Sequence, residues 1–203
     1  AMVRPEPLVP RDLRIGIPER LASNGSILKD LDGEAVATAV EQLKARDVES
    51  IAIGFLHSYT NSDHEARAAE IIETHWPEVS LSLSSEVCPE IREYERFSTT
   101  CANAYIQPLL TRYLTDLETR RNSLGMSCPM LLMQSGGGLG TLEDALQFPV
   151  RLVESGPAGG ALLSAEIARS FGIEKALSFD MGGTTAKLCI INNGQPRTSR
   201  EIE

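Results

Sequence analysis

"SFDMGGTTAKLCIINNG", residues 178–194, is the stretch of the chain that decides its fold. An apolar run ends at Asp180, two glycines and two threonines follow, and a second apolar run begins soon after them. Paired glycines between two apolar runs are typical of the tight turn of a β-hairpin. The sequence therefore predicts a hairpin that brings five residues together at one end: Asp180, Gly182, Gly183, Thr184 and Thr185.

These residue types also suit a phosphate group and its metal ion. Glycine N–H groups can approach a ligand closely, and threonine hydroxyls add further donors. The carboxylate of Asp180, at the end of the first strand, is a hard oxygen ligand of the kind that Mg²⁺ prefers. A plain tight hairpin is the alternative, because the same residues are ordinary turn formers.

The two interpretations differ in what they demand of the glycines. In a phosphate cradle, we expect Gly182 or Gly183 to have a positive φ and to point its N–H at the ligand. Alanine would then strain the turn by roughly 1–2 kcal/mol and would place a methyl group where the phosphate oxygens sit. In a purely structural turn, alanine would lower stability and leave ligand affinity unchanged.

Outward from the hairpin, strand patterns alternate with helix patterns. Strands are expected at 13–20, 50–57, 79–84, 129–134 and 150–155, and helices at 32–47, 62–76, 98–125 and 156–172, with a short helix after Thr141. This alternation predicts an α/β fold with a mixed sheet flanked by helices.

Several helix details follow from residue type. Asp32 is expected to cap the first helix, and Ser62 with Glu65 to form a capping box on the second. The helix 98–125 is expected to kink at Pro108 and to end at Gly125. Its core face is predicted to be one apolar stripe: Ala102, Tyr105, Ile106, Leu109, Leu110, Tyr113, Leu114 and Leu117.

Three further stretches are candidates for a functional role. "QSGGGLG" (134–140), with Ser135, Gly136, Gly137 and Gly138, is either an anion-binding loop between a strand and a helix or a structural turn. "REYERFST" (92–99) is expected to be a solvated loop with salt bridges, the alternative being a substrate-side or lobe-packing role. In the helix 156–172, Pro157 is expected in the first turn. Gly156, Gly159 and Gly160 are expected to allow close packing against a backbone, as in a linker between lobes.

Composition excludes some classes of partner. The chain has 203 residues, of which 42% are hydrophobic and 23% charged, and its net charge is -9 with a pI of about 4.9. This charge argues against general binding to nucleic acid or to an anionic membrane, and no apolar run approaches the ~20 residues of a membrane span. Four cysteines without CxxC spacing predict reduced, buried thiols in a cytoplasmic protein.

The glycine-containing helix followed by the hairpin resembles the actin-like ATPase superfamily, with its ribonuclease H-like lobes. The chain is more closely similar to the hydantoinase A / 5-oxoprolinase family, which includes the N-methylhydantoinases. The segments that carry this resemblance are "PLVPRDLR" (7–14), "SEVCPEIREYERFSTTCANAYIQP" (85–108), "LLMQSGGGLGTLEDALQFPV" (131–150), "ESGPAGG" (154–160) and "DMGGTTAK" (180–187).

The resemblance implies an ATP-dependent hydrolase acting on cyclic amides, in which phosphorylation of the amide oxygen lets water open the ring. It assigns Asp180 to catalysis and to Mg²⁺, and it assigns the turn residues Gly182–Thr185 to ATP. Lys187 departs from the pattern, because chaperone-like and oxoprolinase-like members usually carry an acidic residue there. Its expected role is in ATP binding, facing the phosphates, and the alternative is that it faces the solvent. It suggests a hydantoinase B-type subunit as a partner. A ketone carboxylase subunit and a chaperone-like or activator ATPase are the alternatives.

The resemblance also implies that the chain is an internal fragment. Residues 1–174 would complete a first lobe, with a family boundary near 96, and residues 175–203 would begin the second lobe. The family's first phosphate hairpin, its adenosine-binding motif and most of the second lobe are absent from this sequence.

We therefore expect the chain alone to hydrolyse no ATP and to bind nucleotide only very weakly. Phosphoryl transfer depends chiefly on positioning groups, and many of those groups belong to the absent motifs. Calorimetric titration with Mg-ATP measures this directly, and a micromolar affinity would contradict it.

Overall fold

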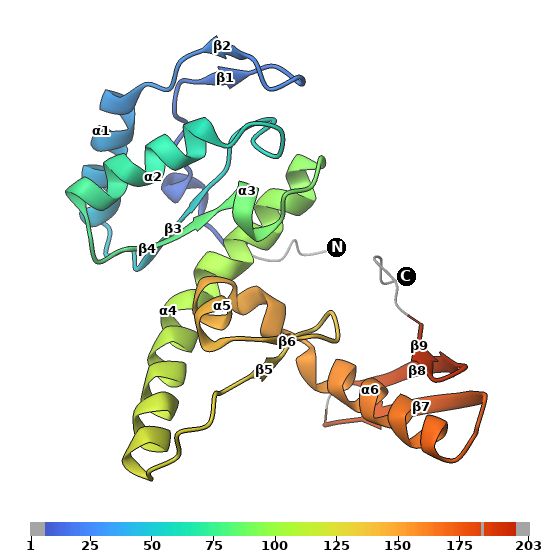
Figure 1. The fold of residues 1–203 in the computed structure, drawn as a ribbon. Coiled ribbons are helices and arrows are strands. Elements are labelled where there is room, and N and C mark those ends of the chain that lie inside the picture. Colours follow the sequence, from blue (N-terminus) through green and yellow to red (C-terminus); the bar gives the residue numbers. More distant parts are fainter. Residues whose placement is uncertain (1–6, 184, 198–203) are drawn as a thin grey trace, which may run out of the picture. The chain divides into compact units, whose positions relative to one another are not determined.

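The computed structural model describes residues 7–183 and 185–197. The chain divides into two compact units, one of Ala1–Thr119 with Leu146–Val150 and the other of Arg120–Ala145 with Arg151–Glu203. Figure 1 shows helices and small sheets in both units, which confirms the predicted α/β class. One parallel pair of strands and three antiparallel groups make up four small sheets in the described residues.

The first unit is a small parallel sheet with helices packed on it. Its elements are η1 (Arg11–Leu13), β1 (Arg20–Leu21), β2 (Ile27–Lys29), α1 (Gly33–Lys44), β3 (Ser50–Ile53), α2 (Asp63–His75), β4 (Ser80–Leu83), α3 (Ser84–Val87) and most of α4 (Glu93–Ser123). Helix α2 connects β3 to β4, which pair in parallel over their whole length. The buried core is Val36, Val40, Ile53, Ala68, Ala69, Ile72 and Val79.

The ends of α1 and α2 test two of the predicted caps. Asp32 Oδ1 accepts a 3.0 Å hydrogen bond from Ala35 N, which confirms the cap on α1. The capping box on α2 is wrong, because Ser62 makes no side-chain cap and Asn61 Oδ1 accepts from Asp63 N instead. Glu65 does not turn back to the helix end, since its carboxylate is fully buried among other polar groups.

Glu65 joins the ends of the two parallel strands. Its Oε1 accepts from Phe55 N at 3.0 Å and from the Ser84 hydroxyl at 2.6 Å. Its Oε2 accepts from Ser85 N at 2.8 Å. A buried carboxylate without such donors would carry a large desolvation cost, so these hydrogen bonds fix the positions of both strand ends.

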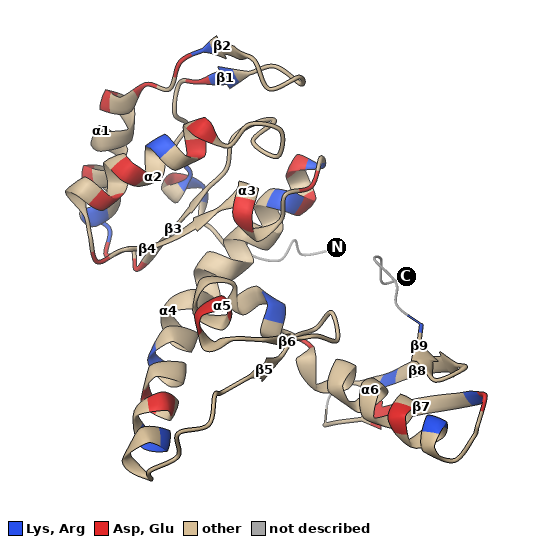
Figure 2. Ribbon diagram, viewed as in Figure 1, with Lys and Arg blue, Asp and Glu red and all other residues tan. Residues whose placement is uncertain are grey.

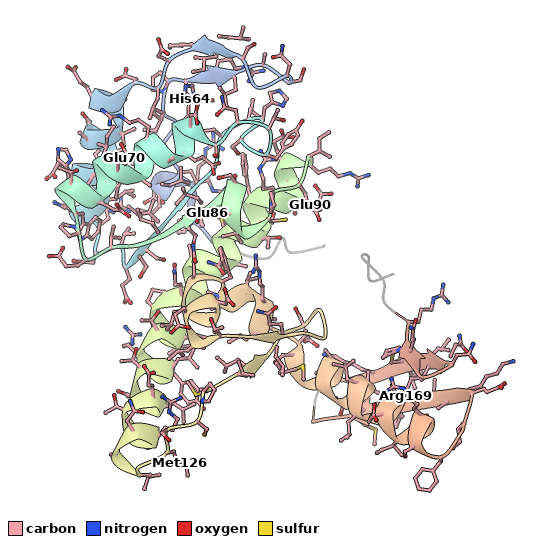
Figure 3. The ribbon with its side chains drawn as sticks, in the orientation of Figure 1. His64, Glu70, Glu86, Glu90, Met126 and Arg169 are labelled. Carbon is pink, nitrogen blue, oxygen red and sulfur yellow. The ribbon has the colours of Figure 1, made fainter. Side chains whose placement is uncertain are left out.

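Arg96 continues the same buried cluster from α4. Its guanidinium donates to the Ser84 hydroxyl at 3.1 Å, to Glu90 O at 2.6 Å and to Phe55 O at 2.9 Å. Glu90 belongs to the loop that leads into α4 (Figure 3). The expectation of a solvated loop at 92–99 is wrong, because α4 begins at Glu93 and Arg96 is fully buried.

The buried face of α4 is polar rather than apolar. Arg96, Thr100, Asn103 and Gln107 are spaced as one face of a helix and are all buried. Asn103 Nδ2 donates to the Ser82 hydroxyl and to Gln147 O, and its Oδ1 accepts from Val150 N. The packing of α4 in this unit therefore rests on hydrogen bonds to β4 and to the segment 146–150.

This polar face overturns the predicted apolar stripe. Leu114 is buried, but Tyr105, Leu109 and Tyr113 are each more than 60% exposed. The helix runs through Pro108 without interruption, and Gly125, with φ +73°, follows its end as predicted.

The second unit contains the predicted hairpin. Its elements are the end of α4, β5 (Leu132–Met133), β6 (Leu139–Gly140), most of α5 (Leu142–Gln147), part of η2 (Pro149–Leu152), α6 (Ser155–Ser170), β7 (Lys175–Met181), β8 (Ala186–Asn192) and β9 (Gln195–Pro196). Thr141 caps α5 as predicted, because its hydroxyl accepts from Asp144 N at 3.2 Å.

Two predicted strands are wrong. The segment 150–155 forms part of η2 and a turn, in which Glu154 is left-handed. Of the segment 13–20, only Arg20 lies in a strand, and the residues before it pair with no described strand. Pro18 disfavours a ladder there, because it has no N–H to donate.

The buried cluster around Arg96 yields a stability prediction. Arg96→Met should lower the free energy of unfolding by about 3–5 kcal/mol, because it leaves buried acceptors without a donor. Arg92→Met is the control, since Arg92 is 70% exposed and a surface change of this kind is worth less than about 0.5 kcal/mol. Urea denaturation of both variants measures the difference, and equal stabilities would contradict the role given to Arg96.

Candidate functional site

The hairpin forms at the predicted residues. Strands β7 and β8 pair antiparallel from Lys175 opposite Asn192 to Met181 opposite Ala186, and Gly182 N donates to Thr185 O at 3.1 Å across the turn. Among the described residues, β7 pairs with β8 alone, and the far end of β8 also pairs with β9. Thr184, one of the predicted phosphate donors, lies outside the described residues.

The hairpin has one face against α6 and one open face. On the α6 side, the Ser164 hydroxyl donates to the Ser178 hydroxyl at 3.2 Å, and Arg169 donates to Gly194 O at 3.1 Å. Figure 3 labels Arg169 on α6. The open face carries large apolar side chains that are 48–70% exposed: Leu177, Phe179, Met181, Leu188 and Ile190.

Asp180 lies on the α6 side, at the turn end of β7. Side chains alternate along a strand, so Asp180 shares the face of Ser178, and its cross-strand partner is Lys187. Asp180 is exposed, and within the described ranges no side chain forms an ion pair or hydrogen bond with its carboxylate. Figure 2 shows few charged positions along the ribbon of β7 and β8.

The conformation predicted for the glycines is wrong. Neither Gly182 nor Gly183 has a φ in the left-handed region, because the turn closes through Gly182 N and Thr185 O without one. A Cβ atom built on either glycine would meet no described atom within 4 Å. Neither strain nor crowding within the described residues therefore requires glycine at these two positions.

The glycines of α6 also differ from expectation. A Cβ on Gly156 or Gly160 would meet nothing within 4 Å, and one on Gly159 would meet only the Met133 side chain at 3.5 Å. In the described part of the chain, these glycines therefore do not serve close packing against a backbone. Pro157 stands in the first turn of α6 as predicted, and the buried small residues of this helix are Ala161, Ala165 and Ala168.

The loop 134–140 is a hairpin turn. Strand β6 begins at Leu139, within this segment, and pairs with β5. Gln134 N donates to Gly138 O, and Gly137 N donates to Gln134 O. Ser135 N donates to Arg151 O, and Gly137 has φ +84°. These contacts favour the structural alternative, because the N–H groups of Ser135 and Gly137 are already used and the Gly138 carbonyl closes the turn.

Sequence reasoning missed a partner of the hairpin. The Lys187 ammonium forms an ion pair with Glu154, which immediately precedes α6 and has φ 65°. Glu154 lies within the quoted motif "ESGPAGG", but nothing in its residue type pointed to a partner 33 positions further along the chain. This ion pair joins β8 to the start of α6, next to Asp180 on β7.

The remaining candidate groups are less suited to chemistry. All four cysteines are free, but they are half-buried or exposed rather than buried as predicted. Burial raises the pKa of the Cys88 and Cys101 thiols, which disfavours the nucleophilic thiolate. Within residues 7–183 and 185–197, no three His, Cys, Asp or Glu side chains are grouped as metal ligands, and no helix is long and apolar enough to cross a membrane.

Family models match both parts of the chain. Residues 96–203 match the hydantoinase/oxoprolinase family, and residues 2–76 match the hydantoinase/oxoprolinase N-terminal region. The chain belongs to the hydantoinase/oxoprolinase family.

Individual relatives agree with this assignment. The chain is 35% identical to the caprolactamase subunit alpha of Pseudomonas jessenii, over 97% of this chain and 28% of that protein. It is 35% identical to the 5-oxoprolinase of Saccharomyces cerevisiae, over 83% of this chain and 13% of that protein. The chain thus spans less than a third of the length of these relatives.

Solved structures give the same fold. The crystal structure of the ATP-dependent caprolactamase from Pseudomonas jessenii superposes with a TM-score of 0.84 at 35% identity, over 92% of this chain and 27% of that one. A nucleotide-free acetone carboxylase superposes with a TM-score of 0.82 at 27% identity, over 94% of this chain and 27% of that one. The chain has the fold of part of an actin-like ATPase lobe.

The ordinary backbone of the turn changes the expected effect of alanine. Gly183→Ala should leave the free energy of unfolding within about 0.5 kcal/mol of the wild-type value or raise it slightly. Gly183 has no left-handed φ that alanine would find strained, and alanine lowers the conformational entropy of the unfolded chain. Gly137→Ala is the matched control, because its φ of +84° makes alanine cost about 1–2 kcal/mol. Equal losses of stability in the two variants would contradict this account of the turn.

Proposed function

We propose that the hairpin 178–194 holds the phosphates and the Mg²⁺ ion of ATP in an enzyme that hydrolyses cyclic amides. The proposal is supported by relatives named caprolactamase and 5-oxoprolinase, and by the fold shared with an ATP-dependent caprolactamase. The chain spans less than a third of those proteins, so we assign the proposed activity to a full-length protein of their kind and not to these 203 residues alone.

The observation that carries the proposal is the open space above Gly182 and Gly183. Glycine at these positions relieves no strain and avoids no described neighbour. A ligand is a physical reason for keeping both side chains absent, because phosphate oxygens need to approach the backbone closely. Thr185, exposed at the far end of the turn, supplies a hydroxyl donor beside that space.

Asp180 fits the metal in the same site. Mg²⁺ in nucleotide sites is bound by one or two carboxylates, by the phosphates and by water, so it does not need a cluster of protein ligands. Asp180 is exposed at the end of β7, and within the described residues its carboxylate forms no ion pair, since the neighbouring Lys187 pairs with Glu154. The residues present therefore fit a nucleotide-bound Mg²⁺ ion.

The chemistry explains why a ring amide requires ATP. The amide carbonyl is a poor electrophile, and transfer of the γ-phosphoryl group of ATP converts its oxygen into a leaving group, after which water opens the ring. The role of the hairpin is to position the phosphates and to stabilise their charge.

Some elements of this proposal extend beyond the chain. We propose two lobes that meet near residues 174–175, a hydantoinase B-type partner subunit and a cytoplasmic location. Relatives that are named as subunits, such as the acetone carboxylase beta subunit of Xanthobacter autotrophicus, support a multi-subunit assembly.

A ketone carboxylase is the second candidate, favoured by the TM-score of 0.82 to acetone carboxylase. Steady-state ATP turnover of the full-length protein separates the candidates. Turnover that depends on added lactams or hydantoins supports the amide hydrolase, and turnover that depends on ketone with bicarbonate supports the carboxylase. Turnover that neither stimulates points to an activator ATPase.

The metal role of Asp180 gives a direct test in the full-length protein. Asp180→Asn should leave the fold intact and reduce turnover by about tenfold or more, because a neutral amide binds Mg²⁺ less well than a carboxylate. Asp116→Asn, at an exposed position of α4, is the control and should retain wild-type turnover. Wild-type turnover in folded Asp180→Asn protein would show that the hairpin is structural.

A further inference from the structure

The position of Lys187 places a cation beside the proposed phosphate site. Lys187 is the cross-strand partner of Asp180, so both side chains leave the sheet on the face that α6 covers. It follows Thr185 by two residues, on the strand that leaves the turn. Its four-carbon stem is flexible, so the ammonium can reach more than one anion from this position.

In the structure, the ammonium pairs with Glu154 rather than with Asp180. The side chains of Lys187 and Glu154 are 34% and 58% exposed, so water partly screens their attraction. Ion pairs of this kind contribute little net free energy and exchange readily. A stronger anion at the turn can therefore take the lysine away from Glu154.

Glu154 has an uncommon backbone conformation at the start of α6. It has φ 65° and ψ 18° between η2 and α6, and non-glycine residues adopt this left-handed conformation rarely. It also precedes the first turn of a 16-residue helix, where the helix dipole favours a negative charge. The helix dipole therefore still stabilises the Glu154 carboxylate when Lys187 no longer pairs with it.

We propose that Glu154 competes with the nucleotide phosphates for Lys187 and thereby limits the affinity of the hairpin for ATP. A triphosphate carries more negative charge than a carboxylate, and a Mg²⁺ ion on Asp180 removes the other anion that faces the lysine. Nucleotide binding then transfers the ammonium from Glu154 to the phosphates. This inference rests on the proposed function and adds Glu154 as a residue that tunes the site without touching the nucleotide.

A double-mutant cycle in the full-length protein tests the competition. The affinity for Mg-ATP is measured by calorimetry for the wild type, Glu154→Gln, Lys187→Met and the double variant. Lys187→Met should weaken binding by about fivefold or more, because it removes a charge-assisted contact to phosphate. Glu154→Gln should tighten binding by about two- to fivefold, the range expected from a partly exposed ion pair.

The double variant is decisive. If Glu154 acts through Lys187, Glu154→Gln has no effect on affinity once Lys187 is methionine. Glu174→Gln and Lys175→Met remove the same charges at the opposite end of the hairpin, and they should leave affinity unchanged. Melting temperatures of all variants identify any that are misfolded, in which case Lys187→Gln and Glu154→Ala replace them.

The remaining outcomes overturn the proposal. Unchanged affinity in Lys187→Met removes the phosphate contact, and weaker or unchanged affinity in Glu154→Gln removes the competition. Tightening by Glu154→Gln that persists in the double variant shows that Glu154 acts on the nucleotide by another route. Failure of the proposed function looks different, because then the wild type and Asp180→Asn bind Mg-ATP equally or not at all.

Discussion

The first unit depends on a charged group that is fully removed from water. The Arg96 side chain has no exposed surface. Its hydrogen bonds end on Phe55 after β3, on Ser84 at the start of α3 and on Glu90 before α4. Ser84 in turn donates to Glu65, so one hydroxyl lies between a buried cation and a buried anion. A buried charge carries a large desolvation cost unless all its hydrogen-bond partners are in place. The cluster therefore makes the positions of strand ends and helix starts depend on one another, although they are far apart in the chain.

The second unit is organised around a different constraint. Helix α6 covers one face of the hairpin through small residues and hydroxyls, which brings the helix start close to the turn end of the strands. Glu154 and Lys187 join the two at that point, beside an aspartate without a partner among the described residues. The groups that would bind phosphate and metal thus lie at the exposed turn end of the hairpin. The hydrogen bonds between β7 and β8 fix the rest of it.

Local patterns in the sequence predicted the elements whose packing is conventional. Helices α1 and α2, the parallel strands and the hairpin 178–194 follow hydrophobic periodicity and turn chemistry. The buried face of α4 escaped prediction because periodicity arguments assume an apolar core face, whereas Asn103 and Gln107 are buried through hydrogen bonds to distant backbone. The same limit hid Glu65, which looked like a capping residue, and Glu154, whose partner lies on another element. At Gly182 and Gly183 the residue type correctly predicted a turn but not its backbone conformation. The turn closes through the hydrogen bond from Gly182 N to Thr185 O, without a left-handed φ at either glycine.

The open face of β7 and β8 has a consequence for how this region folds during synthesis. Leu177, Phe179 and Leu188 lie exposed on this strand pair, and the outer edge of β7 has no ladder partner among the described residues. Apolar strands with a free edge template pairing with other chains. As it leaves the ribosome, a nascent polypeptide carrying this hairpin has two competing fates: burial of that face by other parts of its own chain, or association with a neighbouring copy. Until that face is covered, the hairpin exposes apolar surface together with an unpaired strand edge, the combination that favours association between incompletely folded chains.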